Sequence, residues 1–249
     1  MKMKIFSATD VGQIREDNQD QIYTSGQPIG NLPNIFIVAD GMGGHKAGGF
    51  ASSYGIEIIL ESIRGDHDFN PVKIIRKAME DANRQIIKKA NASNDMKGMG
   101  TTMVIATVVG HYAYIANVGD SRLYVVDDDI TQVTKDHSLV EEMIRLGEIK
   151  REDADKHPDK NIITRALGGK EEVEIDFFEV KLAKASKLVL CSDGLTNMVS
   201  NEEIREVLAQ SNDEDNLASQ LVDRANKNGG KDNIAVIVIE PCIKEVSEC

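Results

Sequence analysis

The sequence contains no tryptophan, and only 4% of its residues are aromatic. A protein that stacks on nucleic-acid bases usually offers aromatic rings, and one that binds the phosphate backbone offers a basic face. Basic residues are also in deficit here, because 41 acidic residues outnumber 29 basic ones and the formal net charge is −12 at pH 7. We therefore expect no nucleic-acid partner.

Long apolar runs and cysteines are scarce as well. The longest largely apolar stretches, 104–109 and 234–239, are far shorter than the roughly 20 residues that a membrane span requires. The first nine residues carry two lysines with no apolar region after them, so they do not resemble a secretory signal. Three widely spaced cysteines provide neither a disulfide framework nor a zinc pattern. These absences predict a soluble, cytoplasmic protein that has no membrane partner.

The chain has 249 residues and shows no repeat, low-complexity run or linker that would divide it. A hydrophobic share of 41% is sufficient for a substantial core. We expect a single domain over residues 1–249, and a monomer.

Short apolar runs alternate along the chain with helical patterns. The strand-like runs are 4–9, 35–39, 101–109, 112–118, 123–126, 173–180, 187–191 and 234–239. Two helical patterns lie together between the second and third runs; one covers 46–63, and the other opens with Asn70 and Pro71. Strands in hairpins with helices in pairs predict an α+β fold of antiparallel sheets flanked by helices.

Further helices are indicated by capping pairs, in which a serine precedes a glutamate by three residues. Ser138 with Glu141 and Ser200 with Glu203 form such pairs, and a last helix is expected over 217–228. The segment 139–164 is highly charged and has no strand period. We expect it to form a helix followed by a mobile surface flap.

Four aspartates stand beside small or polar residues at the ends of apolar runs. Asp40 and Asp193 follow such runs directly or after one residue, Asp120 follows a run and a glycine, and Asp232 precedes the last run. One such aspartate is usually only a turn residue, but four at strand ends favour a shared site. Converging carboxylates repel one another unless a cation neutralises them, and oxygen ligands favour Mg²⁺ or Mn²⁺.

Other phosphate chemistries lack their motifs in this sequence. A cysteine phosphatase needs an arginine six residues after the nucleophile, but Asn197 occupies that position after Cys191. No phosphate-binding loop of the Gly-x4-Gly-Lys-Ser/Thr type is present. The five histidines have no metal-ligand spacing, and we expect each of them at the surface or as a cap.

The ordered motifs of the chain resemble those of the PPM/PP2C metal-dependent protein serine/threonine phosphatases, in the form of the compact bacterial members. The matching segments are Thr9-Asp10-x-Gly12-x-x-Arg15-x-x-Asn18-Gln19-Asp20, Val38-Ala39-Asp40-Gly41-Met42-Gly43-Gly44, Gly100-Thr101-Thr102, Val118-Gly119-Asp120-Ser121-Arg122, Thr134-x-Asp136-His137-Ser138, Cys191-Ser192-Asp193-Gly194-Leu195 and Lys231-Asp232-Asn233. Each motif alone is weak. Together they extend over about residues 5–239.

The resemblance implies a four-layer α-β-β-α sandwich with a metal cluster at one end of its two central sheets. It implies that Asp40 bridges two Mn²⁺ or Mg²⁺ ions, that the Gly41 carbonyl binds one of them, and that Asp193 and Asp232 complete the shell of the second. Asp20 would act through metal-bound water.

The resemblance also implies that Asp120, with help from Asp193, holds a weaker third ion and that Arg15 meets the substrate phosphate. The animal enzymes carry a histidine, proposed to protonate the leaving group, where this chain has Met42. Methionine cannot carry that proton, so another group must act as the acid, and a metal-bound water is the candidate.

The implied activity is hydrolysis of phosphoserine and phosphothreonine in proteins by a water activated between two ions, without a covalent phospho-enzyme. Its expected partners are phosphorylated proteins, including a serine/threonine kinase whose signalling it would counteract. Three alternatives remain open: a phosphoprotein-binding relative without activity, a hydrolase of small phosphoesters, and a sensor or scaffold that uses metal only for folding.

Overall fold

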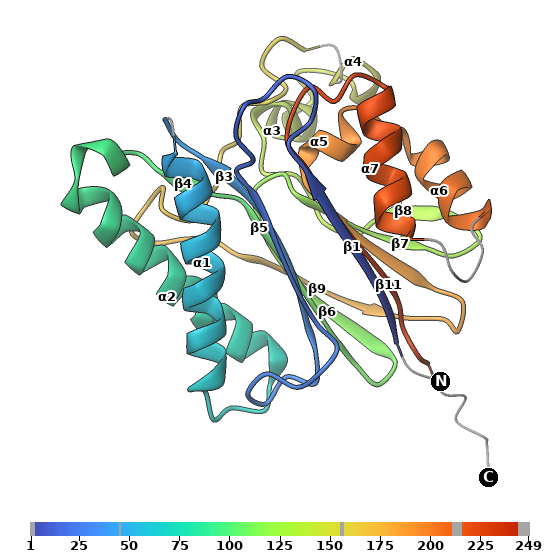
Figure 1. Cartoon of the computed structure of the whole chain (residues 1–249), viewed down its shortest axis with the longest axis horizontal. Coiled ribbons are helices and arrows are strands. Elements are labelled where there is room, and N and C mark those ends of the chain that lie inside the picture. The colour runs from blue at the N-terminus through green and yellow to red at the C-terminus, as the bar shows by residue number, and fades with distance from the viewer. Residues whose placement is uncertain (1–2, 45, 155–156, 211–215, 244–249) are drawn as a thin grey trace.

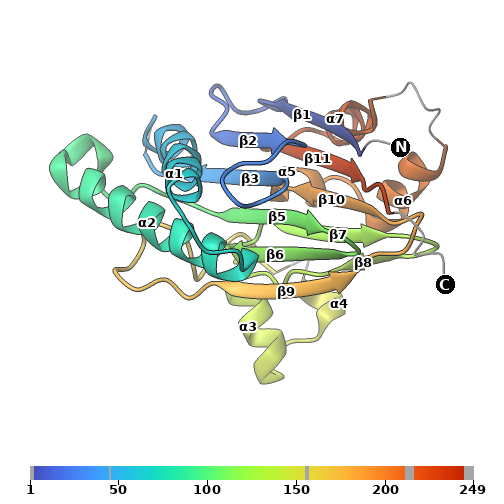
Figure 2. The same ribbon diagram turned by 90° about the horizontal axis from the view of Figure 1, so that it is seen from below.

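The computed structural model describes residues 3–44, 46–154, 157–210 and 216–243. Two antiparallel sheets are stacked face to face (Figures 1 and 2). The first sheet has the order β1 (Lys4–Asp10), β11 (Ile234–Glu240), β10 (Lys187–Cys191), β7 (Arg122–Val126), β8 (Ile130–Gln132). The second has the order β2 (Asp20–Ser25), β3 (Ile35–Met42), β5 (Met103–Val109), β6 (Tyr112–Val118), β9 (Asp176–Lys181), and β4 (Gly100–Thr101) pairs with β3.

Helices cover both outer faces of the stacked sheets. In Figure 1, α1 (Ala47–Arg64) and α2 (Pro71–Ala92) lie on one side, and α6 (Asn201–Gln210) and α7 (Leu217–Lys227) lie on the other. One apolar cluster joins α1 and α2 to the second sheet, and another joins α6 and α7 to the first. The predicted α+β fold with four layers is therefore confirmed.

Several apolar runs, among them β3, β5 and β11, form strands that are buried on both faces. Along β3, the side chains of Ile35 and Ile37 pack toward the helices, whereas Phe36 and Val38 belong to the cluster between the sheets. Successive side chains of a strand point to opposite faces, so a strand between two apolar layers needs apolar residues at every position. This requirement explains why such runs read as continuous rather than alternating.

The predicted helix starts are confirmed by their capping bonds. Asn70 caps α2 by accepting hydrogen bonds from the N–H groups of Val72 and Lys73, and Pro71 occupies the first helical position. At α6, the N–H of Ser200 donates to the Glu203 carboxylate over 3.0 Å, and the N–H of Glu203 donates to the Ser200 hydroxyl over 3.2 Å. This reciprocal pair is a capping box.

Several elements differ from the prediction. The strands β2 and β8 and the one-turn helix α5 (Asp193–Thr196) were not predicted, and neither was the short 3₁₀ helix η1 (Asn94–Met96). The run 101–109 is divided into β4 and β5, and the run 173–180 begins as a strand only at Asp176. The strands β2 and β8 lie at sheet edges and have a weak apolar signal: β2 begins with Asp-Gln, and β8 has only three residues, Ile-Thr-Gln.

The segment 139–164 forms α3 (Leu139–Leu146) and α4 (Arg151–Ala154), and residues 155–156 lie outside the described residues. Its ends meet, because the N–H of Leu139 donates to the carbonyl of Ile162 over 2.8 Å. Figure 1 shows α3 and α4 at the same end of the sandwich as the β1–β2 loop. Within the described residues, none of the helices combines the length and apolar character needed to cross a membrane.

Candidate active site

The predicted aspartates come from both sheets. Asp40 lies on β3 directly opposite Asp20 on β2, in the antiparallel register. Asp120 follows β6, whereas Asp193 opens α5 just beyond β10 and Asp232 lies two residues before β11. Electrostatic coupling links Asp40 with each of the other four carboxylates. The fold therefore brings together side chains that are up to 212 residues apart in the chain.

The environment of these aspartates disfavours their charged form. Burial raises the pKa of Asp40 well above its ordinary range, and the neighbouring charges, first that of Asp20, raise it further. Burial and the charge of Asp193 raise the pKa of Asp120 to about 7. Burial and the charge of Asp232 raise that of Asp193 to about 6. Carboxylates held this close are stable in their ionised form only when a cation lies beside them.

A serine hydroxyl links the two sheets by hydrogen bonds next to the aspartates. Ser192, at the end of β10, donates to Asp20 Oδ2 over 2.6 Å and accepts from the N–H of Ala235 over 2.9 Å. The other oxygen of Asp20, Oδ1, is buried and has no hydrogen-bond partner among the described residues. Burial is also the main reason why the pKa of Asp20 rises to about 7.

The loop 11–19 is attached to the beginning of β11 by the side chain of Asn233. Its amide nitrogen donates to the carbonyls of Val11 and Asp17, and its oxygen accepts from the N–H of Gln19. This loop carries Arg15, whose guanidinium donates to Asp232 Oδ2 over 2.8 Å. The bond raises the pKa of Arg15 further. More than half of the Arg15 side chain remains exposed.

Two glycines allow the backbone segments of the site to approach closely. A Cβ on Gly41 would lie 2.1 Å from the carbonyl oxygen of Gly48, and one on Gly194 would lie 1.9 Å from that of Asn233. Both distances are too short for any side chain, so these positions require glycine. The hollow above Gly41 has a volume of about 450 Å³ and is lined by Arg15, Asp40 and Asp232 as well.

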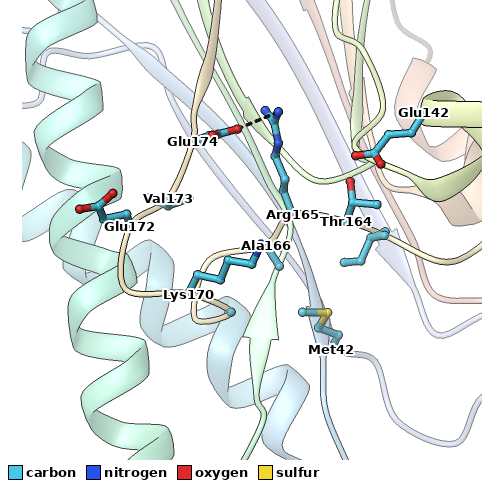
Figure 3. A pocket seen from close by; sticks show the side chains of 11 residues that line it. Met42, Glu142, Thr164, Arg165, Ala166, Lys170, Glu172, Val173 and Glu174 are labelled. Atoms are coloured by element: carbon cyan, nitrogen blue, oxygen red, sulfur yellow. Dashed lines mark ion pairs between the residues drawn. The ribbon is translucent and has the colours of Figure 1, made fainter. Parts of the chain in front are cut away.

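A second hollow, of about 510 Å³, adjoins the first at Met42, which lines both. Figure 3 shows Arg165 reaching across it toward Glu174, with which it forms an ion pair of 2.8 Å. Arg165 also donates to Asp176 over 3.1 Å. In Figure 3, Glu142 on α3 stands on the opposite side of the hollow from Glu172.

Not every residue that the sequence singles out joins this cluster. Asp10 accepts hydrogen bonds from the N–H of Gly12 and from the Asn226 side chain, so it holds a turn together. His137 was expected at the surface or as a cap; that prediction is wrong, because only 6% of it is exposed and Ser138 rather than His137 caps α3. Ser192 and Asn233 were not predicted as site residues, although each stands next to an aspartate that was.

The donor set fits hard divalent cations. All the candidate side-chain donors are carboxylate oxygens, which suit Mg²⁺ and Mn²⁺, and the unpartnered Oδ1 of Asp20 offers a further acceptor. No group of three or more His, Cys, Asp and Glu side chains in the described part of the chain is arranged to hold an ion by itself. Backbone carbonyls and water would therefore have to supply the remaining ligands.

The architecture defines an α+β protein of four layers with an acidic site where its two sheets meet. A family model described as protein phosphatase 2C matches residues 12–234. A serine/threonine phosphatase of Listeria welshimeri is 42% identical over 239 residues, with 93% of each chain covered. The protein phosphatase PhpP of Streptococcus pneumoniae is 37% identical over 241 residues, which cover 95% of this chain and 97% of that one.

Solved structures give the same result. The serine/threonine phosphatase Stp1 of Staphylococcus aureus superposes with a TM-score of 0.89 at 34% identity, over 98% of this chain and 96% of that chain. The catalytic domain of the phosphatase PstP, solved with 2 manganese ions, superposes with a TM-score of 0.83 at 31% identity, over 95% and 97% of the two chains. The chain belongs to the protein phosphatase 2C family, and it is a protein serine/threonine phosphatase by class.

Proposed function

We propose that this chain hydrolyses phosphoserine and phosphothreonine in proteins, using a water activated between two Mn²⁺ or Mg²⁺ ions. The observation that carries the proposal is the set of buried aspartates from both sheets whose negative charges repel one another. Such a cluster costs stability unless cations are bound, so its persistence in a folded protein indicates a function.

We assign the ion-binding roles to the clustered oxygens. Asp40 would bridge the two ions, the Gly41 carbonyl would bind one of them, and Asp193 and Asp232 would bind the other. Asp20 would act through water, and Asp120 would hold a weaker third ion. When bound, the ions would lower the pKa of a water to about 7 and neutralise charge on the phosphoryl oxygens.

Arg15 is proposed to bind the substrate phosphate. Its side chain is more than half exposed and is held at its tip by Asp232. Rotation about its side-chain bonds can carry the guanidinium from that carboxylate to a phosphate at the mouth of the hollow. A guanidinium can donate to two phosphate oxygens at once, which both binds and orients the group.

The chain supports direct attack by water better than a covalent intermediate. Cys191, the cysteine nearest to the site in sequence, is fully buried, and burial raises the pKa of its thiol to about 12. Such a thiol is not ionised at neutral pH and is not a nucleophile. Met42, at the junction of the two hollows, has no proton to give to the leaving oxygen.

Phosphorylated proteins are the proposed substrates, and a serine/threonine kinase in the cytoplasm is the proposed opposing activity. We further propose that the whole chain works as one domain, because both sheets contribute side chains to one site, and that it is a monomer.

The proposal is tested with purified protein on phosphothreonine peptides, small metabolite phosphates and an aryl phosphate, each with Mn²⁺, with Mg²⁺ and with a chelator. We expect turnover of the peptides that depends on added metal and a lower kcat/KM for the metabolites. Better turnover of metabolites would favour the small-phosphoester hydrolase. No turnover of any substrate would favour the inactive binding protein or the scaffold.

A further inference from the structure

His137 is buried between three parts of the chain that approach the site. It precedes α3, its ring lies against the turn after β6, and its other side faces β9. The N–H of Gly119 donates to its Nδ1 over 3.1 Å, and its own N–H donates to the Gly119 carbonyl over 3.0 Å. The carbonyl of His137 accepts from the N–H of Thr164 over 2.7 Å.

These contacts define which ring nitrogen carries the proton. Because Nδ1 accepts from a backbone N–H, the proton of a neutral imidazole must lie on Nε2. Nε2 lies 3.2 Å from Asp176 Oδ2, which is an acceptor. Arg165 Nη1 also lies 3.4 Å from this nitrogen, but a guanidinium can only donate, so it cannot accept the proton of a protonated Nε2. The carboxylate of Asp176 is therefore the acceptor that faces Nε2–H.

The turn that His137 holds carries Asp120. Gly119 has a φ of +107°, and a Cβ there would lie 2.5 Å from the side chain of Thr102. Thr102 Oγ1 in turn hydrogen-bonds with Ser121 over 2.7 Å and accepts from the N–H of Asp40. Thr102 therefore holds the Gly119–Asp120 turn on the side of Asp40, and His137 holds it on the side of β9.

We propose that His137 is a positioning residue, whose neutral Nε2–H imidazole holds the Gly119–Asp120 turn so that the Asp120 carboxylate faces the reaction centre. The residue acts through the backbone of Gly119 and does not touch substrate. This inference rests on the proposed function only in the role of Asp120. His137 also bonds to Thr164, at the end of the 139–164 segment. The turn that carries Asp120 and that segment are therefore both held by His137.

Two amide variants distinguish positioning from simple packing. In His137→Asn the side-chain oxygen can occupy the place of Nδ1 and accept from Gly119, whereas in His137→Gln the amide extends toward the place of Nε2. We expect His137→Asn to retain kcat within about threefold and His137→Gln to lose about tenfold, the effect of one lost hydrogen bond. Melting temperatures of the metal-free variants serve as the control for folding.

The coupling to Asp120 is tested with a double-mutant cycle. If His137 acts through Asp120, His137→Gln will cost little in an Asp120→Ala background, because the group that it positions is already absent. Equal losses in the two amide variants, or fully additive losses in the cycle, would overturn the proposal.

A spectroscopic measurement on the metal-free protein tests the geometry without any activity. The imidazole ¹⁵N spectrum should show an unprotonated Nδ1 and a protonated Nε2 at neutral pH. The opposite tautomer, or a doubly protonated ring, would overturn the inference. If the wild-type protein shows no phosphatase activity, the proposed function fails, and this spectrum still decides the inference.

Discussion

The aspartate cluster and the 139–164 segment lie at the same end of the molecule but are built differently. The cluster is held by bonds between residues far apart in sequence, such as Ser192 with Asp20 and Asn233 with Asp17, which are 172 and 216 positions apart. Many of the bonds of the segment join closer neighbours, such as Arg151 with Glu141, 10 positions apart, although Lys160 also reaches Asn197, 37 positions away. We therefore expect the cluster to be unable to rearrange without disturbing both sheets, and the segment to open without unfolding them.

The largest expected effect comes from removing a carboxylate of the cluster. Asp193→Asn should lower kcat with Mn²⁺ by at least about a hundredfold, because it removes a charged ligand from the proposed site. The same change removes a repulsive buried charge, so the metal-free variant should melt at the same temperature as the wild type or higher. Near-normal turnover at saturating Mn²⁺ would contradict the assignment. Asp223→Asn, on α7, is a control outside the cluster.

Arg15→Ala should have the next largest effect. Loss of a charge-assisted bond to phosphate should lower kcat/KM about tenfold or more. Calorimetry should show Mn²⁺ affinity unchanged or increased, because Asp232 no longer shares its oxygen with the guanidinium. The kcat/KM of Arg15→Lys, which keeps the charge but not the forked pair of donors, should fall between those of the wild type and Arg15→Ala. A kcat/KM equal to that of the wild type would exclude the proposed role.

The pH dependence of stability should separate the cluster from the rest of the molecule. The raised pKa values of Asp20 and Asp120, about 7, and of Asp193, about 6, mean that the folded metal-free protein binds more protons than the unfolded chain between pH 4 and 7. The stability from these groups is therefore present at low pH and is lost as the pH rises through that window. We expect the melting temperature of the metal-free protein to fall by about 5 °C between pH 5 and 7.5. With Mn²⁺ the fall should be absent, and an equal fall with Mn²⁺ would contradict the explanation.

The smallest expected effects come from the helix caps. They test most directly whether the 139–164 segment unfolds separately from the sheets. Ser138→Ala and Ser200→Ala each remove an N-cap bond worth about 1 kcal/mol. The change at Ser200 should lower the melting temperature of the whole protein, whereas the change at Ser138 should only speed amide hydrogen exchange in α3. Equal shifts in melting temperature would show that the segment unfolds together with the sheets.

The sequence predicted the parts of the fold that have a strong local signal. The strands β3 and β11 are buried on both faces and therefore appear as continuous apolar runs, and Asn70 with Pro71 predicts the start of α2 from chemistry within four residues. The edge strand β2 reads Asp-Gln-Ile-Tyr-Thr-Ser, with a weak apolar character, and was missed.

The candidate site, too, was predicted only where its residues have a local signal in the sequence. Asp40, Asp193 and Asp232 follow or precede apolar runs, and the fold does bring them together. The roles of Ser192, Asn233 and His137 depend on partners more than 15 residues away, which no local pattern reveals. His137 in particular was expected at the surface or as a cap, whereas it is buried against Gly119 after β6 and Asp176 on β9, which are distant in sequence.

The close approach at Gly41 and Gly194 has a consequence for any survey of mutational tolerance. Neither glycine offers a side chain to substrate, yet any replacement would push a neighbouring carbonyl out of place. In a saturation scan scored by growth or activity, both positions should tolerate change as poorly as the aspartates beside them. Such a scan would extend the functional region to Gly194, which has no role in the proposed chemistry, and an alanine variant there would be inactive for purely steric reasons.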